Sequence, residues 1–214
     1  MPYLFEEDVP EYVIGFDIDI PGHWKQYDLS GDALARMRAQ AVEQYGNRPE
    51  EMSALNDLFS DIAQVTNDAV GAGLLSAAGV FEEYDDGFFM ATVCVFVFPS
   101  GRGDQALEPV RMVENVYSGS ATAREGTWLR KVAADLTHTG LGLCGRVFGV
   151  TDHDMDDAIV RSVAMHTAFE VPGLDKRVMV SCTSPNSREA EEVLDLFDAI
   201  TGTARFWEEA TPSS

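Results

Sequence analysis

The 214-residue sequence has few basic residues and no long hydrophobic segment. Lysine and arginine together number 15 against 36 aspartates and glutamates, so the formal net charge is −21. Binding to naked nucleic acid requires a basic surface, and this composition argues against it. A membrane-spanning helix needs about 18 consecutive apolar residues. The longest strongly apolar stretch, residues 88–98, is rich in aromatic and β-branched residues and has the length of a strand.

The sequence also has no recognisable secretory signal and no pattern of paired cysteines. Its first residues include neither a basic segment nor an apolar one, as a signal peptide would. Cys94, Cys144 and Cys182 are an odd number, and each lies among apolar residues. We therefore expect buried free thiols rather than disulfides, which is typical of a cytoplasmic protein.

Motifs of known enzymes and metal sites are missing. His23, His138, His153 and His166 are not spaced as zinc ligands, and no Gly-x-Ser-x-Gly elbow is present. The glycines within 140–145 have the spacing of a dinucleotide-binding loop but lie between two strand patterns. Such a loop must open a helix, whose N-terminus binds the phosphates. The sequence therefore predicts no catalytic residue, no metal and no cofactor.

Two further segments have a chemical interpretation that competes with a structural one. The aspartates of 152–157 could bind a hard cation, but they lack the ligand spacing and central glycine of a calcium loop. A solvated turn between strands is the favoured interpretation. Cys144 lies close to Arg146, which could lower the pKa of its thiol, but the surrounding glycines and leucines favour packing within a strand.

The periodicity of apolar residues predicts an α+β fold. Residues 12–20 alternate apolar and polar side chains, which is typical of a half-buried strand. Asp-Gly at 86–87 predicts a hairpin, whose second strand is apolar on both faces and should be central in the sheet. Further strands are expected near 128–138, 141–150, 158–171 and 176–183, and a loop of small polar residues at 118–126.

Four segments have helical spacing. Ser30 is the expected N-cap of a helix that ends at Gly46, and Pro49 opens a longer helix that ends near Gly71. Pro109 opens a shorter one. In the longer helix the apolar stripe is widened by two extra residues; its members are Met52, Leu55, Leu58, Phe59, Ile62, Val65, Thr66 and Ala69.

The last helix follows a Ser-Pro-Asn corner. Asn186 as N-cap would place Glu189 where a capping-box partner belongs, and Ser184 followed by Pro185 is the alternative cap. Its expected buried stripe is Ala190, Val193, Leu194, Phe197 and Ile200, and Gly202 ends the helix.

These elements predict one domain over residues 1–214, with flexible tails at 1–10 and 208–214. The expected architecture is a mostly antiparallel central sheet flanked by helices on both faces.

Three stretches, "DIDIPGHWKQYDL", "ADLTHTGLGLCGRVF" and "EVPGLDKRVMVSCTSPNSREAEEVLDLFDAITGTARFW", resemble a group of uncharacterised actinobacterial proteins that is similar to the PsbP-like α/β sandwich. The resemblance implies an antiparallel sheet between helices and a binding function, because most known functions of this fold are binding functions. Its motifs are structural. The lipoprotein members have a lipid-attachment cysteine near their start, which is not found here, so an envelope role is not expected.

Three functions remain open. The favoured one is a non-enzymatic protein that binds another protein through its acidic surface, with a basic protein as one expected partner. One form is an immunity or chaperone-like partner of a basic toxin or secreted substrate. The alternative is a carrier of a small ligand or lipid, with a pocket near Trp24. An enzyme of unrecognised type is less favoured. The candidate ligand or partner surface comprises His23, Trp24, Tyr27 and Arg146.

Overall fold

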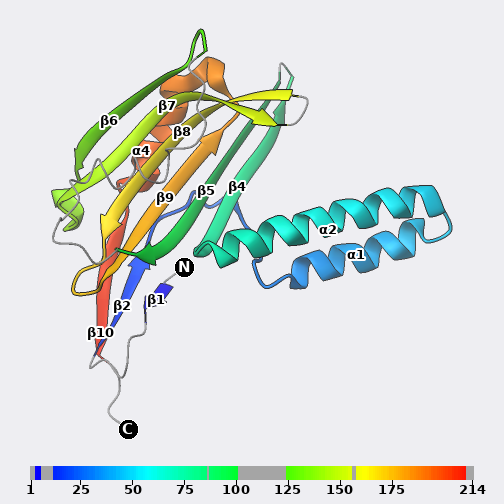
Figure 1. Cartoon of the computed structure of the whole chain (residues 1–214), viewed down its shortest axis with the longest axis horizontal. Coiled ribbons are helices and arrows are strands. Elements are labelled where there is room, and N and C mark those ends of the chain that lie inside the picture. The colour runs from blue at the N-terminus through cyan, green and yellow to red at the C-terminus, as the bar shows by residue number, and fades with distance from the viewer. Residues whose placement is uncertain (1–2, 6–11, 86, 101–123, 156–157, 211–214) are drawn as a thin grey trace.

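The computed structural model describes residues 3–5, 12–85, 87–100, 124–155 and 158–210. Within these ranges the chain forms a seven-stranded sheet, a three-stranded sheet and three α-helices (Figure 1). The prediction of an α+β fold with an antiparallel sheet is therefore confirmed. The helix expected from Pro109 and most of the loop expected at 118–126 lie outside the described residues.

Every neighbouring pair of strands in the seven-stranded sheet is antiparallel. The strand order is β3-β4-β5-β9-β8-β7-β6. The bounds are β3 (Lys25–Gln26), β4 (Leu74–Tyr84), β5 (Gly87–Pro99), β6 (Trp128–Asp135), β7 (Leu143–Met155), β8 (Ala158–Glu170) and β9 (Lys176–Ser184).

Strand β5 has the central position that its sequence predicts. It pairs with β4 through the expected hairpin and with β9 on its other side. Val93 and Val95 are buried on one face, whereas Cys94 between them is only partly exposed on the other. Neither face of this part of the strand is fully open to water, which explains why the sequence is apolar here on both faces.

A smaller sheet contains both ends of the described chain. Its order is β1-β2-β10, with bounds β1 (Tyr3–Phe5), β2 (Tyr12–Asp17) and β10 (Arg205–Ala210). The alternation in 12–20 correctly predicts β2, and Ile14 and Phe16 are buried in the core. Strands β1 and β10 include residues that the sequence analysis assigned to the terminal tails.

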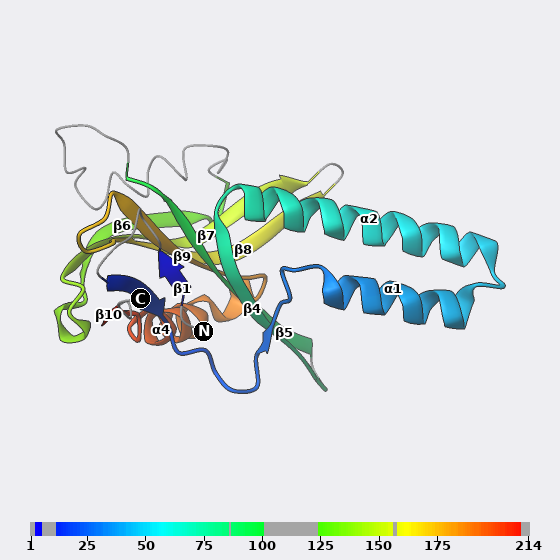
Figure 2. The ribbon, with the colours of Figure 1, turned by 90° about the horizontal axis from the view of Figure 1, so that it is seen from below.

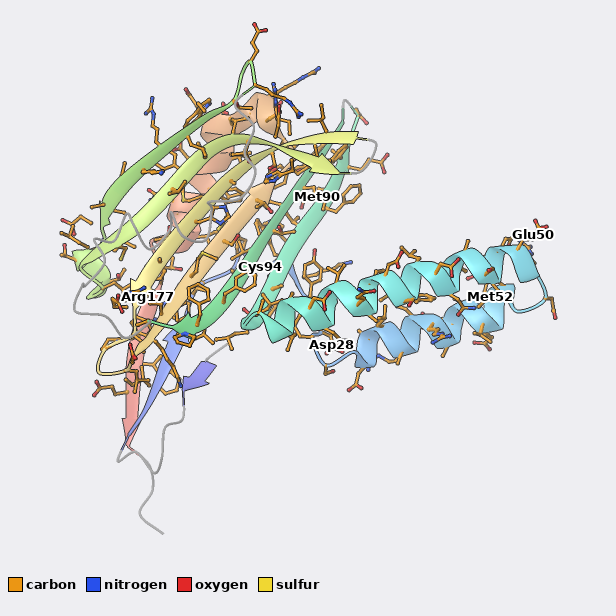
Figure 3. All side chains as sticks on the ribbon, in the orientation of Figure 1. Asp28, Glu50, Met52, Met90, Cys94 and Arg177 are labelled. Atoms are coloured by element: carbon orange, nitrogen blue, oxygen red, sulfur yellow. The ribbon has the colours of Figure 1, made fainter. Side chains whose placement is uncertain are left out.

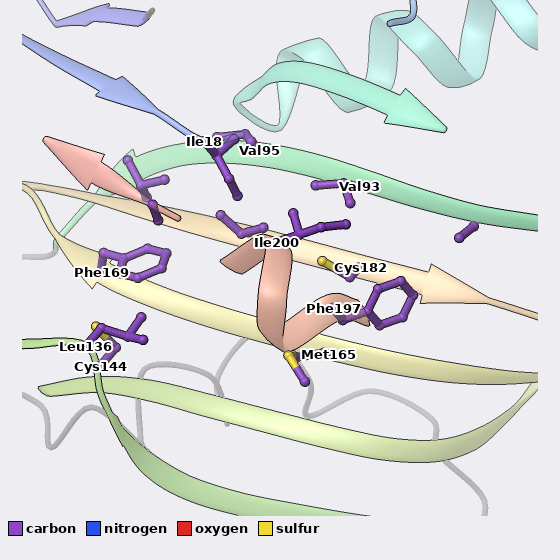
Figure 4. Close-up of a cluster of buried hydrophobic side chains, with 14 of the residues drawn as sticks. Ile18, Val93, Val95, Leu136, Cys144, Met165, Phe169, Cys182, Phe197 and Ile200 are labelled. Atoms are coloured by element: carbon purple, nitrogen blue, oxygen red, sulfur yellow. The ribbon is translucent and has the colours of Figure 1, made fainter. Parts of the chain in front are cut away.

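Helix α4 (Ala190–Thr201) covers part of one face of the large sheet, where it packs against β7, β8 and β9. The predicted stripe is confirmed: Val193, Leu194, Phe197 and Ile200 are all buried, and Ala190 packs at its edge. Figure 4 shows Phe197 and Ile200 over the sheet, near Met165. The hydrophobic core therefore lies between α4 and the strands beneath it.

The Ser-Pro-Asn corner does not cap this helix as predicted. Asn186 makes no side-chain cap, and a short 3₁₀ turn (Ser187–Glu189) precedes α4. Instead its amide donates to the Phe88 carbonyl at 2.7 Å and accepts from the Met90 N–H at 3.0 Å. The buried Ser184 hydroxyl donates to the Met90 carbonyl at 2.6 Å. Both side chains therefore tie the end of β9 to β5 beyond Thr92 and Thr183, the last paired residues of these two strands.

Helices α1 (Asp32–Tyr45) and α2 (Pro49–Gly71) form a hairpin that projects away from the sheet as an arm (Figures 1 and 2). Figure 3 places Asp28 at its base and Glu50 and Met52 at its far end. Within the described part of the chain, α4 is the only α-helix that packs along a face of the sheet. The expected bounds of both helices agree with the structure. Both helices were expected to cover a face of the sheet, whereas they extend away from it.

The N-cap of α1 is Gly31 rather than the predicted Ser30. The Ser30 hydroxyl accepts only a long hydrogen bond from the Asp32 N–H, at 3.3 Å, and Asp28 binds the start of the helix more closely. The Asp28 carboxylate accepts hydrogen bonds from the Ala33 N–H at 2.7 Å and from the N–H and hydroxyl of Ser30. The hydrogen bond from the Ser30 hydroxyl, followed by those from the backbone, lowers the pKa of this carboxyl. An acidic side chain at a helix N-terminus also interacts favourably with the helix dipole.

Candidate binding surfaces

The structure does not gather the four residues of the predicted ligand surface around one cavity. Trp24 is only 7% exposed and belongs to the hydrophobic core. His23 is exposed, with its Nε2 3.9 Å from a carboxylate oxygen of Glu82. Tyr27 lines one cavity and Arg146 another, at different places on the sheet. The sequence analysis expected Trp24 to lie beside a ligand pocket, whereas its side chain packs in the hydrophobic core.

The Tyr27 cavity lies between β4, β5 and the segment that leads into the arm. Its volume is about 400 Å³. The Tyr27 hydroxyl packs on Gly79, where an added Cβ would lie 2.4 Å from the phenolic oxygen, so glycine is needed for this tyrosine position. The lining is mainly apolar and consists of Ile18, Ile20, Gln26, Tyr27, Asp28, Leu29, Leu75, Ser76, Ala77, Ala78, Val93 and Val95.

A second, wider cavity, which we call the Arg146 groove, lies on the α4 side of the large sheet. It has a volume of about 730 Å³. Its floor comes from β6 and β7, which α4 leaves partly uncovered, and its walls come from α4 and from the link between β6 and β7. The lining residues are Val132, Ala134, Asp135, Leu136, His138, Arg146, Phe148, Met165, Leu194, Asp195, Asp198, Ala199, Gly202 and Thr203.

Arg146 is buried in the middle of β7, with 7% of its surface exposed. Its Nε donates to the Thr167 hydroxyl at 3.0 Å and its Nη1 to the Asp198 carboxylate. Its Nη2 is buried and has no hydrogen-bond partner among the described residues. Charged donors are rarely left in this state, because an unsatisfied buried polar group costs about 1–3 kcal/mol.

The rim of the Arg146 groove is mostly acidic. Asp135, Asp195 and Asp198 are exposed on it. Hydrogen bonds from the backbone and side chain of Thr137 hold the pKa of the Asp135 carboxyl below its usual value. His138 has its Nε2 3.3 Å from the Gly202 carbonyl oxygen, which connects the link between β6 and β7 to the end of α4. The groove thus combines one buried cation with several exposed carboxylates.

The exposed side of α2 has two parallel rows of side chains. Leu58, Ile62 and Val65 form an apolar row and are exposed by 52%, 41% and 68%. Their spacing of four and three residues places them on one side of the helix. An acidic row runs beside them, and its members, Glu50, Asp57, Asp61 and Asp68, are all exposed. The apolar row belongs to the stripe that the sequence predicted, but its exposure and the acidic row beside it were not predicted.

The side of α2 towards α1 is only half-buried. The residues at helical spacing on this side are Met52, Leu55, Phe59, Ala63 and Thr66, and no residue described in α2 is fully buried. A two-helix hairpin has too few neighbours to cover two wide apolar stripes. The second stripe of α2 is therefore left in water.

The thiols and the buried histidine do not form a nucleophilic site. Burial raises the pKa of Cys144 to about 11 and that of Cys182 to about 12. Arg146 lowers the pKa of Cys144, as the sequence analysis considered, but by less than burial raises it. Burial also lowers the pKa of His166 to about 4. A thiol must ionise to act as a nucleophile, so neither buried cysteine is primed to react at neutral pH.

The described residues contain no group of three or more His, Cys, Asp or Glu side chains arranged to hold a metal ion. The first aspartate of the acidic run, Asp152, lies within β7 rather than in a turn. It is 2% exposed, and its carboxylate accepts two hydrogen bonds from the Arg161 guanidinium at 2.7 and 2.9 Å. Arg161 therefore occupies the oxygens that a cation would need.

Comparison of the chain with protein-family models, with curated proteins and with solved structures found no match in any of the three. Among the helices of the described chain, none has both the length and the apolar character needed to cross a bilayer. The function must therefore be argued from the cavities and surfaces themselves.

Proposed function

We propose that the protein is a non-enzymatic binding protein that engages a basic, amphipathic helical segment of another protein through the exposed side of α2. The observation that supports this function is the pairing of an apolar row with a parallel acidic row on a helix that projects from the body. Helices of this kind bind other amphipathic helices through apolar residues three and four positions apart.

The apolar row supplies the affinity in this proposal. Full burial of one exposed Leu, Ile or Val side chain stabilises a complex by about 1.5–3 kcal/mol before ordering costs. Leu58, Ile62 and Val65 together can therefore support a specific interaction of moderate strength. Apolar contacts alone do not distinguish one amphipathic helix from another, so the charges beside them determine which partner binds.

The acidic row selects a basic partner. Helix α2 contains five acidic residues and no lysine or arginine, and the whole chain has a net charge of −21. A second copy of the chain would place two acidic rows near each other in a two-fold dimer, which is repulsive. Lysines beside the apolar residues of a different protein would instead be attracted to Asp57, Asp61 and Asp68.

A designed peptide tests this chemistry directly. A fluorescent Leu–Lys peptide with its leucines on one helical face is titrated with the protein, and a scrambled peptide of the same composition is the control. Wild-type protein should prefer the amphipathic peptide by at least about tenfold, equivalent to about 1.4 kcal/mol. Equal affinity for both peptides would mean attraction by net charge alone and would refute the proposal.

The matched variants separate apolar contact from charge. Replacing Ile62 and Val65 with aspartate adds two negative charges, so non-specific attraction should increase, yet we expect the affinity to fall at least about tenfold. Leu143→Asp is the control because Leu143 is 65% exposed on the sheet. Unchanged or tighter binding by the double variant would contradict the proposed role of the apolar row.

The natural partner can be captured through the same surface. A photo-crosslinking amino acid at Val65 should give one specific adduct in the native host, with a basic protein. The same group at Leu143 should not give this adduct. Adducts that are identical from both positions would count against α2 as the binding surface.

The Tyr27 cavity supports a second candidate function, a carrier of a small apolar ligand. A volume of about 400 Å³ is within the range of small-molecule sites, and the cavity is adjacent to the base of the arm. Native mass spectrometry should detect a co-purified ligand or an added medium-chain fatty acid. Replacing Ala78 in the lining with leucine should remove that mass, and no retained mass in the wild type would rule the carrier out.

The finer fold assignment also remains a proposal. The resemblance of the sequence to PsbP-like proteins implies a sandwich with helices on both faces of the sheet and, with the sequence features above, a cytoplasmic binding protein. The antiparallel sheet, with α4 on one of its faces, supports the sheet and one helical layer of this implication, but not helices on the second face. A binding function is common to the resemblance and to the surfaces described above.

A further inference from the structure

We propose that the Arg146 groove is a second binding site, independent of α2, for a small zwitterion resembling an apolar amino acid. In this site the ligand carboxylate pairs with the Arg146 guanidinium and the ligand ammonium group pairs with aspartates of the rim. Three features support this site: the unsatisfied guanidinium, the exposed carboxylate beside it, and the charges and lining of the groove.

The guanidinium of Arg146 has an incomplete set of partners. Thr167 and Asp198 accept from Nε and Nη1, whereas the buried Nη2 has no partner among the residues that the structure describes. A guanidinium offers its donors as a rigid fork that fits both oxygens of one carboxylate. Asp198 uses only one oxygen, so the fork is available for a better-fitting carboxylate.

Asp198 can give up its place to a ligand. Its side chain is 61% exposed, whereas that of Arg146 is 8% exposed. A carboxylate at the surface of α4 regains hydration when it rotates into water, so leaving costs it little. The Arg146 side chain cannot move outward with Asp198, because it is buried in the sheet and its Nε donates to the Thr167 hydroxyl. A ligand carboxylate that replaces Asp198 would keep the buried cation neutralised throughout.

The rim decides what else the ligand carries. Asp135 and Asp195 are exposed in the lining beside His138, and Asp198 would still lie at this edge of the groove after it turns away from Arg146. A purely anionic ligand such as phosphate would be attracted by Arg146 but repelled by the three carboxylates near it. A ligand that has an ammonium group near its carboxylate is attracted both by Arg146 and by the aspartates of the rim. The charge pattern therefore favours a zwitterion over a simple anion.

The lining decides the side chain of the ligand. A volume of about 730 Å³ is in the usual range for small-molecule sites and exceeds what a single small amino acid needs. Between the polar groups the groove is apolar, with Val132, Ala134, Leu136, Phe148, Met165 and Leu194 in its lining. An apolar amino acid or a short peptide with an apolar end residue would fit this surface.

The test is a titration of the full-length protein with single apolar L-amino acids and their capped forms, followed by NMR of labelled protein. Leucine, methionine and phenylalanine are the probes. At least one should shift resonances of Arg146 and α4 with a Kd of about 1 mM or tighter. Its amide, which lacks the carboxylate, and its N-acetyl form, which lacks the ammonium group, should each bind at least about tenfold more weakly.

Three variants keep the proposal falsifiable. Arg146→Lys retains the charge but not the fork, and should weaken binding at least about tenfold. Because that change lies in the core, two milder variants accompany it. Asp195→Asn removes one rim charge from an exposed position, and Ala134→Leu narrows the groove from β6; both should weaken binding at least about threefold with an unchanged thermal midpoint.

Several outcomes would overturn the proposal. One is the absence of any shift with all three amino acids at about ten times the expected Kd. Another is equal affinity for an amino acid and its amide. A third is full binding by both folded mild variants, which would place the ligand elsewhere on the protein.

Discussion

Replacing Phe197 with alanine would test whether the packing of α4 on the large sheet stabilises the fold. Phe197 is 0% exposed and belongs to the core cluster between α4 and the sheet. Removing a fully buried phenylalanine ring typically costs about 3–5 kcal/mol, because the transfer energy is lost and a cavity remains. The hydrogen-bonded strands below Phe197 cannot collapse into that cavity, so we expect a loss within this range.

A loss of this size is a large share of the total stability of a typical domain, about 5–15 kcal/mol. For a chain of this length it corresponds to a thermal midpoint lowered by about 6–20 °C. Urea unfolding followed by circular dichroism and by tryptophan fluorescence measures it, since Trp24 is in the same core.

Leu58→Ala on α2 is the matched control. Leu58 is 52% exposed, so its removal should change stability by no more than about 0.5 kcal/mol. A loss below about 1 kcal/mol for Phe197→Ala, with an unchanged denaturant slope, would refute the position of α4 on the sheet.

Two further predictions concern the small sheet and the buried ion pair. Gly15→Ala places a Cβ 2.2 Å from the ring of Trp207, its partner on β10. The half-buried ring must then leave its position against β2, so we expect a loss of about 1–3 kcal/mol, and an unaltered urea midpoint would contradict the packing of Trp207 on Gly15. The hydrogen bond from Arg161 lowers the pKa of the Asp152 carboxyl. The interaction of the Asp152 carboxylate with Arg161 therefore stabilises the fold above the pKa of an unfolded aspartate, about 3.9. This stabilisation is lost as the pH falls through the lower pKa that Asp152 has in the folded protein. Asp152→Asn should therefore be less stable at pH 7 and lose less stability between pH 5 and 2 than wild type; parallel pH profiles for both proteins would contradict the pair.

The elements that were predicted well are those whose burial follows from local periodicity. The apolar residues on both sides of β5 indicated a central strand, and β5 does pair on both edges. The spacing of Val193, Phe197 and Ile200 indicated which side of α4 is buried. In both cases a side chain's direction depends only on the backbone geometry of its own element.

The features that were missed depend on contacts between distant segments. Strand β10 was assigned in part to a tail, because its pairing partner, β2, lies almost the whole chain away and cannot be found from local periodicity. Asn186 was expected to cap the helix that follows it. The position of β5 gave its amide backbone partners about a hundred residues away instead.

The sequence by itself determined that α2 is a helix with a wide apolar stripe, because the order of residues sets which side chains share one side of a helix. It did not determine what that stripe faces. The same is true of Arg146: its partners Thr167 and Asp198 lie 21 and 52 residues further along the chain. Only the tertiary structure decided that part of the α2 stripe stays in water and that this arginine is buried beside a groove. Exposure and pairing are properties of the assembled surface, and they depend on which distant segments the fold brings together.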